Sequence, residues 1–452
     1  MRPVVHTACS VLLIIWQMVP ADAQPAGRTL TFADAEREAL ANSVDVKVAD
    51  SAVDAAEYGL KSSRTLRLPI VTLESNVLVW NESLEFDIAL PGMMPPPGSE
   101  PEPITVRGRV TSTTTLSVGV PVSYQLVIRD LVKLQERGVR AATIDRDGAR
   151  TNVAYKAADA YISVLLAQSA VNIATTRVKQ LEAQTAQARI LRQGGVLQKL
   201  DVLRLEAALA AARAEVINGE SNVRLALDLL VLAVGLPPQT QLEVEDDFPE
   251  SPAAPPHGAA DGIQLAENRR SELGLLRMRT EQAHLAARVE KTKLLPDVLA
   301  VASFQHSEGG GTLQSQNAWF AGLTLSWDVW DWFGQWNKHK EAKAKATQAM
   351  LAQTQARDGI RTEVSVTANS AQAAHKLLAV TLAGVQAAEE AYRLQKDRFD
   401  EGAATTTDIL DAEAELAQAR LARVNARYSY FRALVRLAKS TGQLPSAVIS
   451  KI

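Results

Sequence analysis

The stretch Gly402–Ala414 reads GAATTTDILDAEA, and an earlier stretch, Gly195–Ala207, reads GVLQKLDVLRLEA. Glycine, aspartate, leucine, glutamate and alanine recur in the two stretches at one constant shift along the chain. A repeat of this kind indicates a duplicated structural unit. Because glycine accepts the left-handed backbone that ends a helix, each stretch predicts the turn of an antiparallel helical hairpin.

The positions of the prolines agree with two long hairpins. Residues 122–236 and 297–444 contain no proline, whereas proline breaks helix interiors. We therefore expect one helical hairpin at about 126–235 and a second at about 335–441. The first of these spans would run for roughly 100 Å in one direction if it were a continuous helix up to Gly194, which exceeds the size of a compact domain.

Strands precede each hairpin. Apolar and polar residues alternate over about 70–85 and 105–122 in the first half, and over about 297–306 and 317–328 in the second. This alternation predicts strands with one apolar and one polar face. Each half is thus expected to be a helix-strand-strand-helix-helix unit, giving a mainly α protein with four strands.

The chain divides into five segments. Residues 1–23 combine Arg2, an apolar run and a small-residue cleavage site, as in a secretory signal peptide. The first repeat occupies 24–244 and the second 263–445. Between them, 245–262 is rich in proline, alanine and glycine and is predicted to be a linker, and 446–452 is left as a C-terminal tail.

Composition excludes several classes of protein. The 452 residues are 47% hydrophobic and 22% charged with a net charge of −3, so a disordered chain and a nucleic-acid-binding protein are both disfavoured. The single cysteine, Cys9, lies in the signal segment, which excludes a disulfide scaffold and a thiolate enzyme. Beyond Ala23 no run reaches the roughly 18 uninterrupted apolar residues of a membrane helix, so a membrane would be spanned by strands.

Four strands are too few to close a membrane barrel, because the smallest single-chain barrels have eight and lipid-exposed sheet edges are not tolerated. Three copies would supply twelve strands. Long coiled-coil hairpins extending from such a barrel would form a tube. The sequence therefore predicts a trimeric duct.

The order of elements, the duplication, the Leu-Pro pair before the first strand of each half, and the motif from Gly402 to Asp411 with Glu413 resemble the TolC-type outer-membrane efflux family. The resemblance implies a homotrimer in the bacterial outer membrane, in contact with its lipid. It also implies a periplasmic helical tunnel that docks an adaptor protein and an inner-membrane pump or ABC transporter. The expected function is the exit duct of tripartite efflux or type I secretion.

The resemblance also implies site residues. Asp408 and Asp411 match the acidic residues that ring the periplasmic entrance and set its cation preference. Gly195, Gly402 and Ala404 lie at the hairpin tips where an adaptor would dock. Some family members carry a basic residue at the position of Ala404 that helps to hold the entrance shut, so this chain departs from that pattern.

A simpler interpretation of the acidic residues stays open. Asp201, which we also place at a docking tip, and Asp408 each follow a turn by six residues and could only stabilise a helix start. Asp411 shares a helical face with Asp408, which could simply be a solvated face. Trp319, Trp327 and Trp330 are expected to form a membrane-interface belt, although a ligand-stacking platform is the alternative.

No enzyme, cofactor or metal site is expected. The histidines lack metal-ligand spacing, and there is no phosphate loop or nucleophile motif. Two other classes remain as alternatives: a periplasmic coiled-coil adaptor or scaffold without a pore, which would have one hairpin, and a plain porin, which would have many strands and few helices.

Overall fold

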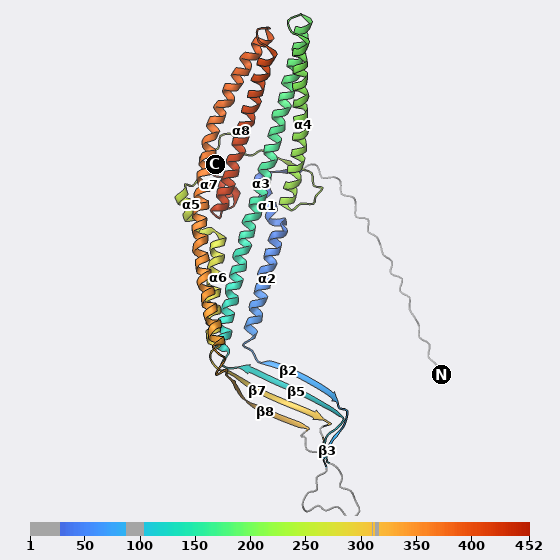
Figure 1. Ribbon diagram of the computed structural model, residues 1–452, viewed down its shortest axis with the longest axis vertical. Helices are drawn as coiled ribbons and strands as arrows, with labels where there is room; N and C mark the ends of the chain where they lie inside the picture. Colours follow the sequence, from blue (N-terminus) through green and yellow to red (C-terminus); the bar gives the residue numbers. More distant parts are fainter. Residues whose placement is uncertain (1–27, 87–103, 310, 312–315) are drawn as a thin grey trace, which may run out of the picture.

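The computed structural model describes residues 28–86, 104–309, 311 and 316–452. The predicted signal peptide, 1–23, lies outside this part of the chain. Long helices fill most of the molecule and a sheet lies at one end, as Figure 1 shows. The helical hairpin turns lie at the opposite end, farthest from the sheet.

Four long helices form the two hairpins: α3 (Gln125–Gln193), α4 (Lys199–Val234), α7 (Gly334–Asp400) and α8 (Thr406–Ser440). The 69 residues of α3 form one uninterrupted helix, which at 1.5 Å per residue is roughly 100 Å long. In the half away from the sheet, α3 packs along α4, and α7 packs along α8. Contacts between α3 and α8 join the two hairpins.

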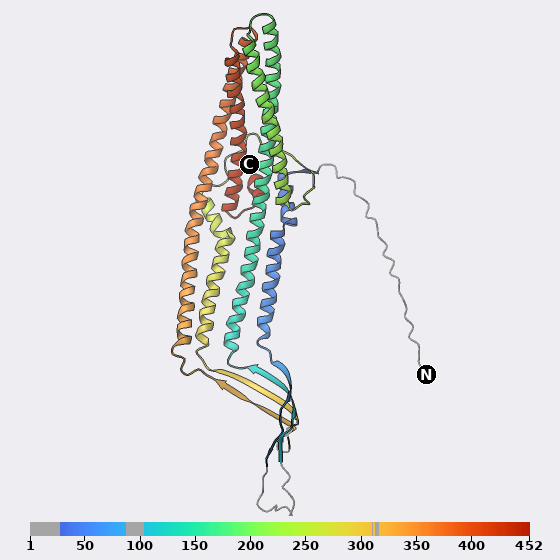
Figure 2. The same ribbon diagram turned by 45° about the vertical axis from the view of Figure 1, so that its right-hand side comes forward.

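Shorter helices complete the half near the sheet. They are α1 (Phe32–Asn42), α2 (Val44–Thr65), α5 (Ala259–Arg269) and α6 (Ser271–Thr292). Both repeats therefore begin with two helices separated by one extended residue, where a single helix was expected. In both views α2 and α6 run beside the lower parts of α3 and α7 (Figures 1 and 2).

The main sheet contains β2 (Ile70–Val79), β5 (Val110–Pro121), β7 (Asp297–Glu308) and β8 (Asn317–Ser326). Their order is β2-β5-β7-β8, and all three pairings are antiparallel. The strands β5 and β7, from different repeats, are the central pair. Within the described residues β2 and β8 each have a strand neighbour on one side only.

The predicted strands 70–85 and 105–122 are wrong in their extent, because each is divided into two strands, and the second divides between Arg107 and Val110. β2 ends at Val79, and a separate strand β3 (Leu84–Phe86) pairs with β4 (Ile104–Arg107) in a two-stranded ribbon. Trp80 stacks against the guanidinium of Arg107, whose carbon lies 3.7 Å from the ring centroid. This ribbon prolongs the sheet away from the helices (Figure 1).

The main sheet has two chemically different faces, because alternate residues of a strand point to opposite sides. The strand register aligns a row of apolar residues on one face: Leu73, Leu116, Phe304 and Trp319. One residue further along the first three strands, the other face carries an aligned polar row: Glu74, Thr115 and Gln305. The sheet thus separates an apolar surface from a polar one, as a wall between lipid and water requires.

The segment 245–262, predicted to be a linker, is a packed connection. Phe248 is 5% exposed, and its ring stacks on Phe431 with centroids 4.2 Å apart. Just before it, β6 (Leu242–Val244) pairs in parallel with β1 (Arg28–Leu30), and α5 begins inside the predicted linker. The proline and glycine content of the segment does not by itself predict that Phe248 is buried.

The predicted tail, 446–452, is also structured. Pro445–Ile449 form a short helix, α9, and Val448 is buried in the main core. The backbone N–H of Ser446 donates to Glu36 Oε2 at 2.9 Å, which fastens α9 to α1. The end of the second repeat thus contacts the beginning of the first.

One window of α3 is long and apolar enough to cross a membrane by length and composition. Part of this helix lies in the main core, where Tyr161, Ile162 and Leu165 are buried. The core helices of soluble proteins can be equally long and apolar, so this stretch of α3 does not by itself indicate a membrane span. Strands remain the membrane elements that the sequence favours.

Candidate functional site: the hairpin tips

The first tip joins α3 to α4. Gly195 has a φ of +78°, and the N–H of Val196 donates to the carbonyl of Leu191 at 2.9 Å, which closes the end of α3. Helix α4 then begins with a capping box in which the N–H of Gln198 donates to Asp201 Oδ2 at 3.1 Å. Asp201 therefore has a local structural role.

The second tip, between α7 and α8, repeats this arrangement. Gly402 has a φ of +73°, and the N–H of Ala403 donates to the carbonyl of Arg398 at 2.8 Å. Thr405 caps α8, and its N–H and hydroxyl donate to Asp408 Oδ2 at 2.9 and 2.7 Å. These hydrogen bonds from Thr405, the backbone one first, hold the pKa of Asp408 below its ordinary value.

The two tips touch each other. A Cβ atom built on Gly402 would lie 3.2 Å from Val196 Cγ1 of the first tip, whereas a Cβ on Gly195 would have nothing within 4 Å. Arg204 Nη1 donates to Thr407 Oγ1 at 3.3 Å across the same contact. Ala404 is partly buried against the cluster of apolar residues shared by the two hairpins.

The structure places Asp408 and Asp411 on the exposed side of the first turns of α8. Ile409, between them, points inward and is fully buried. Asp408 is engaged by Thr405, and Asp411 has no hydrogen-bond or ion-pair partner among the described residues. The simpler interpretation of Asp408 as a residue that stabilises a helix start is confirmed, because it caps α8. Asp411 is exposed on the same side of the helix, as the solvated face that is its simpler interpretation requires.

A buried ion pair near the tips was missed at the sequence level. Glu413 on α8 is 1% exposed and accepts from Arg177 Nε of α3 at 3.0 and 3.2 Å. The same guanidinium donates through Nη1 to Glu215 of α4 at 3.0 Å. Burial raises the pKa of Glu413 despite the opposing effect of Arg177. A signal was present, since Glu413 falls in the apolar spacing of Ile409 and Leu416.

A polar groove of about 480 Å³ lies between α3 and α7, a few turns from the tips. Gln184, which is 4% exposed, donates from Nε2 to the Tyr392 hydroxyl at 2.9 Å. Its Oε1 is buried without a partner in the described chain. Lys396 and Asp400, paired at 2.7 Å, line the same groove.

The predicted aromatic belt divides between the two ends of β8. Trp319 lies near the start of the strand, in the apolar row, and is 79% exposed. Trp327 and Trp330 follow the strand, next to α7, where Trp327 Nε1 donates to the carbonyl of Leu294. Trp330 packs edge-on against Trp332. Exposed tryptophans at both ends of one strand fit two membrane interfaces.

Three histidines of the described chain are hydrogen-bonded to other protein groups. His306 lies 2.8 Å from Asn317 Oδ1, His339 bonds the carbonyl of Ala287, and His375 bonds the carbonyl of Pro252. Among the described residues no cluster of three or more histidines, cysteines or acidic residues could hold a metal ion.

Comparison with known proteins identifies the family of this chain. The sequence profile of the outer membrane efflux protein family matches residues 36–236 and 262–443. The outer membrane efflux protein BepC of Brucella suis biovar 1 (strain 1330) is 24% identical over 354 residues, which cover 75% of each chain.

Solved structures agree in fold. The outer-membrane channel OprN superposes with a TM-score of 0.77 at 21% identity, covering 91% of this chain and 89% of that one. VceC from Vibrio cholerae gives a TM-score of 0.74 at 17% identity, covering 91% and 96%. With both repeats matched by the family profile, the chain belongs to the outer membrane efflux protein family.

Proposed function

We propose that three copies of this chain form the exit duct through which compounds delivered by a periplasmic adaptor and an inner-membrane pump or ABC transporter leave the cell. The protein is an outer-membrane efflux channel by family. Channels of this family form trimers and work with an adaptor and an inner-membrane pump. What we propose for this chain is which residues make the contacts between its copies and with the adaptor.

The observation that carries the proposal is the four-stranded sheet, whose two outer strands have no further strand partner among the described residues. Strands β2 and β8 offer unpaired backbone groups, and such groups are costly in lipid. Pairing β2 of one copy with β8 of the next would satisfy these groups. Three copies then give twelve strands, with the row of Glu74 toward water and the row of Leu73 toward lipid.

The hairpins supply the periplasmic part of the duct. At roughly 100 Å, α3 can reach deep into the periplasm from a sheet held in the membrane. The adaptor would dock at the tips, around Gly195, Asp201, Gly402 and Ala404. Asp408 and Asp411, gathered by threefold symmetry, would form a ring of carboxylates at the entrance and favour cations.

Channel recordings test this proposal. The purified full complex, inserted into planar bilayers, should conduct ions in steps and prefer cations under a salt gradient. In cells, deletion of the gene should abolish export of the native cargo, and the wild-type chain should restore it. A complex that inserts without conducting would contradict the duct.

A further inference from the structure

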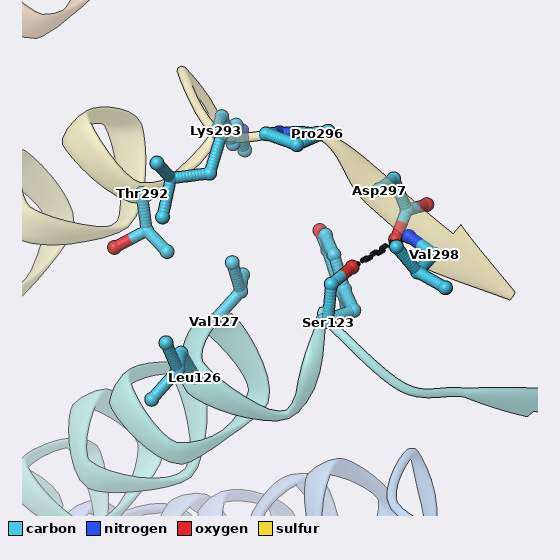
Figure 3. Close-up of a pocket in the computed structure, with 10 residues that line it drawn as sticks. Ser123, Leu126, Val127, Thr292, Lys293, Pro296, Asp297 and Val298 are labelled. Atoms are coloured by element: carbon cyan, nitrogen blue, oxygen red, sulfur yellow. Dashed lines mark hydrogen bonds between the residues drawn. The ribbon is translucent and has the colours of Figure 1, made fainter. Parts of the chain in front are cut away.

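An apolar cavity of about 420 Å³ lies where the sheet meets the helices (Figure 3). It is formed by the β5–α3 connection, the start of α3, the end of α6 with the residues that follow it, and the start of β7. Ser123 closes one side, because its hydroxyl donates to Asp297 Oδ1 at 2.9 Å and accepts the N–H of Val298 at 2.7 Å. The apolar lining residues are Leu126, Val127, Leu295, Pro296 and Val298.

The cavity continues the apolar face of the sheet. Val298 is six residues before Phe304 on β7, so the two side chains share a face. That face is the one that would meet lipid in the proposed barrel, on which this inference rests, and Val298 lies at its helix-proximal end. Because β5 and β7 are the central strands, the cavity is also away from the edges β2 and β8, where neighbouring copies would pair.

A second, polar cavity of about 500 Å³ adjoins the first. The two share Lys293, Leu295 and Asp297 as lining residues. The Lys293 ammonium is bonded to Glu290 at 2.8 Å, which leaves further N–H donors. The polar cavity adds a second cation, Lys338 of α7, and two acids of the β8–α7 connection, Asp328 and Asp331.

We infer that the paired cavities bind one zwitterionic glycerophospholipid of the inner leaflet per protomer, with an acyl chain in the apolar cavity and the headgroup in the polar one. Adjoining spaces of opposite polarity at a membrane boundary match an amphiphile. Lys293 and Lys338 suit the phosphate, and the three carboxylates suit an ammonium. Since acids outnumber bases in the polar cavity, a purely anionic headgroup fits less well.

The test is native mass spectrometry of the purified full complex titrated with phosphatidylethanolamine or phosphatidylglycerol. Leu126→Gln and Leu295→Gln each place an amide in the apolar cavity at a side chain that is already 50% or 59% exposed, so folding should persist. Leu232→Gln, at a leucine on α4 that is 76% exposed, is the matched control. Lys293→Gln has its control in Lys345→Gln, which removes a similar ion pair with Glu341.

The wild-type complex should retain about one phosphatidylethanolamine per protomer, and the cavity variants should bind it about tenfold more weakly, while both controls bind as wild type. Lys293→Gln should weaken binding to a smaller extent. Equal binding by cavity variants and controls, or no retained lipid in the wild type, would overturn the inference. Preference for phosphatidylglycerol would overturn the headgroup assignment. The lipid titration needs neither conduction nor an export partner, so this test and the conductance test fail independently.

Discussion

The two hairpin tips begin from the same local structure and differ in their surroundings. Gly195 and Gly402 both have left-handed backbones, and Asp201 and Asp408 both close capping boxes. The difference begins one helical turn further on, where the first tip has Arg204 and the second, at the duplicated position, has Asp411.

Two further duplicated positions show the same divergence. Glu206 on α4 makes an ion pair with Arg189 at a partly exposed site, whereas its counterpart Glu413 is buried against Arg177. Gly195 faces open space, whereas Gly402 lies against Val196. The two tips thus share what a helix end needs, and only the second has a buried charge and an additional acid.

The largest difference in stability cost is expected between replacements of the two duplicated glutamates, Glu413 and Glu206. Glu413→Ala leaves Arg177 without its buried partner and should lower the free energy of unfolding by about 2 kcal/mol. Glu206→Ala removes a partly exposed pair and should cost about 0.5 kcal/mol or less. Thermal unfolding of the purified complex, followed by circular dichroism, measures both, and equal shifts would refute the assigned burial.

The stability cost of replacing the turn glycine should differ less between the two tips. Gly402→Val imposes a left-handed β-branched residue and presses on Val196, at a cost of about 2 kcal/mol, whereas Gly195→Val meets only the backbone penalty of about 1 kcal/mol. Amide hydrogen exchange at each tip gives the local stability. Adaptor crosslinking should also fall more for Gly402→Val, and unchanged crosslinking in both variants would count against docking at the tips.

The entrance acids should change ion preference more than stability. In a trimer, Asp408 and Asp411 would raise the cation concentration within a Debye length of about 8 Å at physiological salt. The double change to Asn should therefore lower cation selectivity in the reversal potential and weaken block by multivalent cations. Asp201→Asn, the matched change at the first tip, should have a smaller effect. If the double variant assembles and its reversal potential is unaltered, these aspartates face bulk water.

The smallest expected effect is a pH dependence at Glu413. Burial raises the pKa of this carboxyl in the folded protein, so the folded state binds its proton more tightly than the unfolded state, where the pKa is about 4.3. Wild-type stability should thus decline relative to Glu413→Gln as pH rises from about 4 through the raised pKa. Parallel stability curves for the two proteins would show that the pKa is not raised.

Local sequence signals were sufficient for the tips and for the positions of the four strands of the main sheet, but not for the separate ribbon of β3 and β4. A glycine followed by a capping residue predicts a helix end and the start of the next helix from local sequence alone. The alternation of apolar and polar residues in β5 or β7 likewise predicts which side chains share a face of the strand, without knowledge of the neighbouring strand. The duplication located both hairpins for the same reason. Asp408 could be placed at a helix start from its distance to Gly402.

Features that depend on distant partners could not be read in this way. Phe248 lies in a proline-rich segment, and only its stacking on Phe431 reveals a packed connection. The pairing of β1 with β6 joins segments about two hundred residues apart, each too short to show a pattern. Arg177 bridges α4 and α8, so its role depends on how the two hairpins pack.

We propose that this chain is one third of a membrane duct, because β2 and β8 each lack a second strand partner in the part of the chain that the structure describes. The most direct measurement is the mass of the complex extracted from outer membranes, with the bound detergent subtracted. Three protomers per particle, stable in detergent, are predicted. A monodisperse monomer with an intact sheet by circular dichroism would contradict the account.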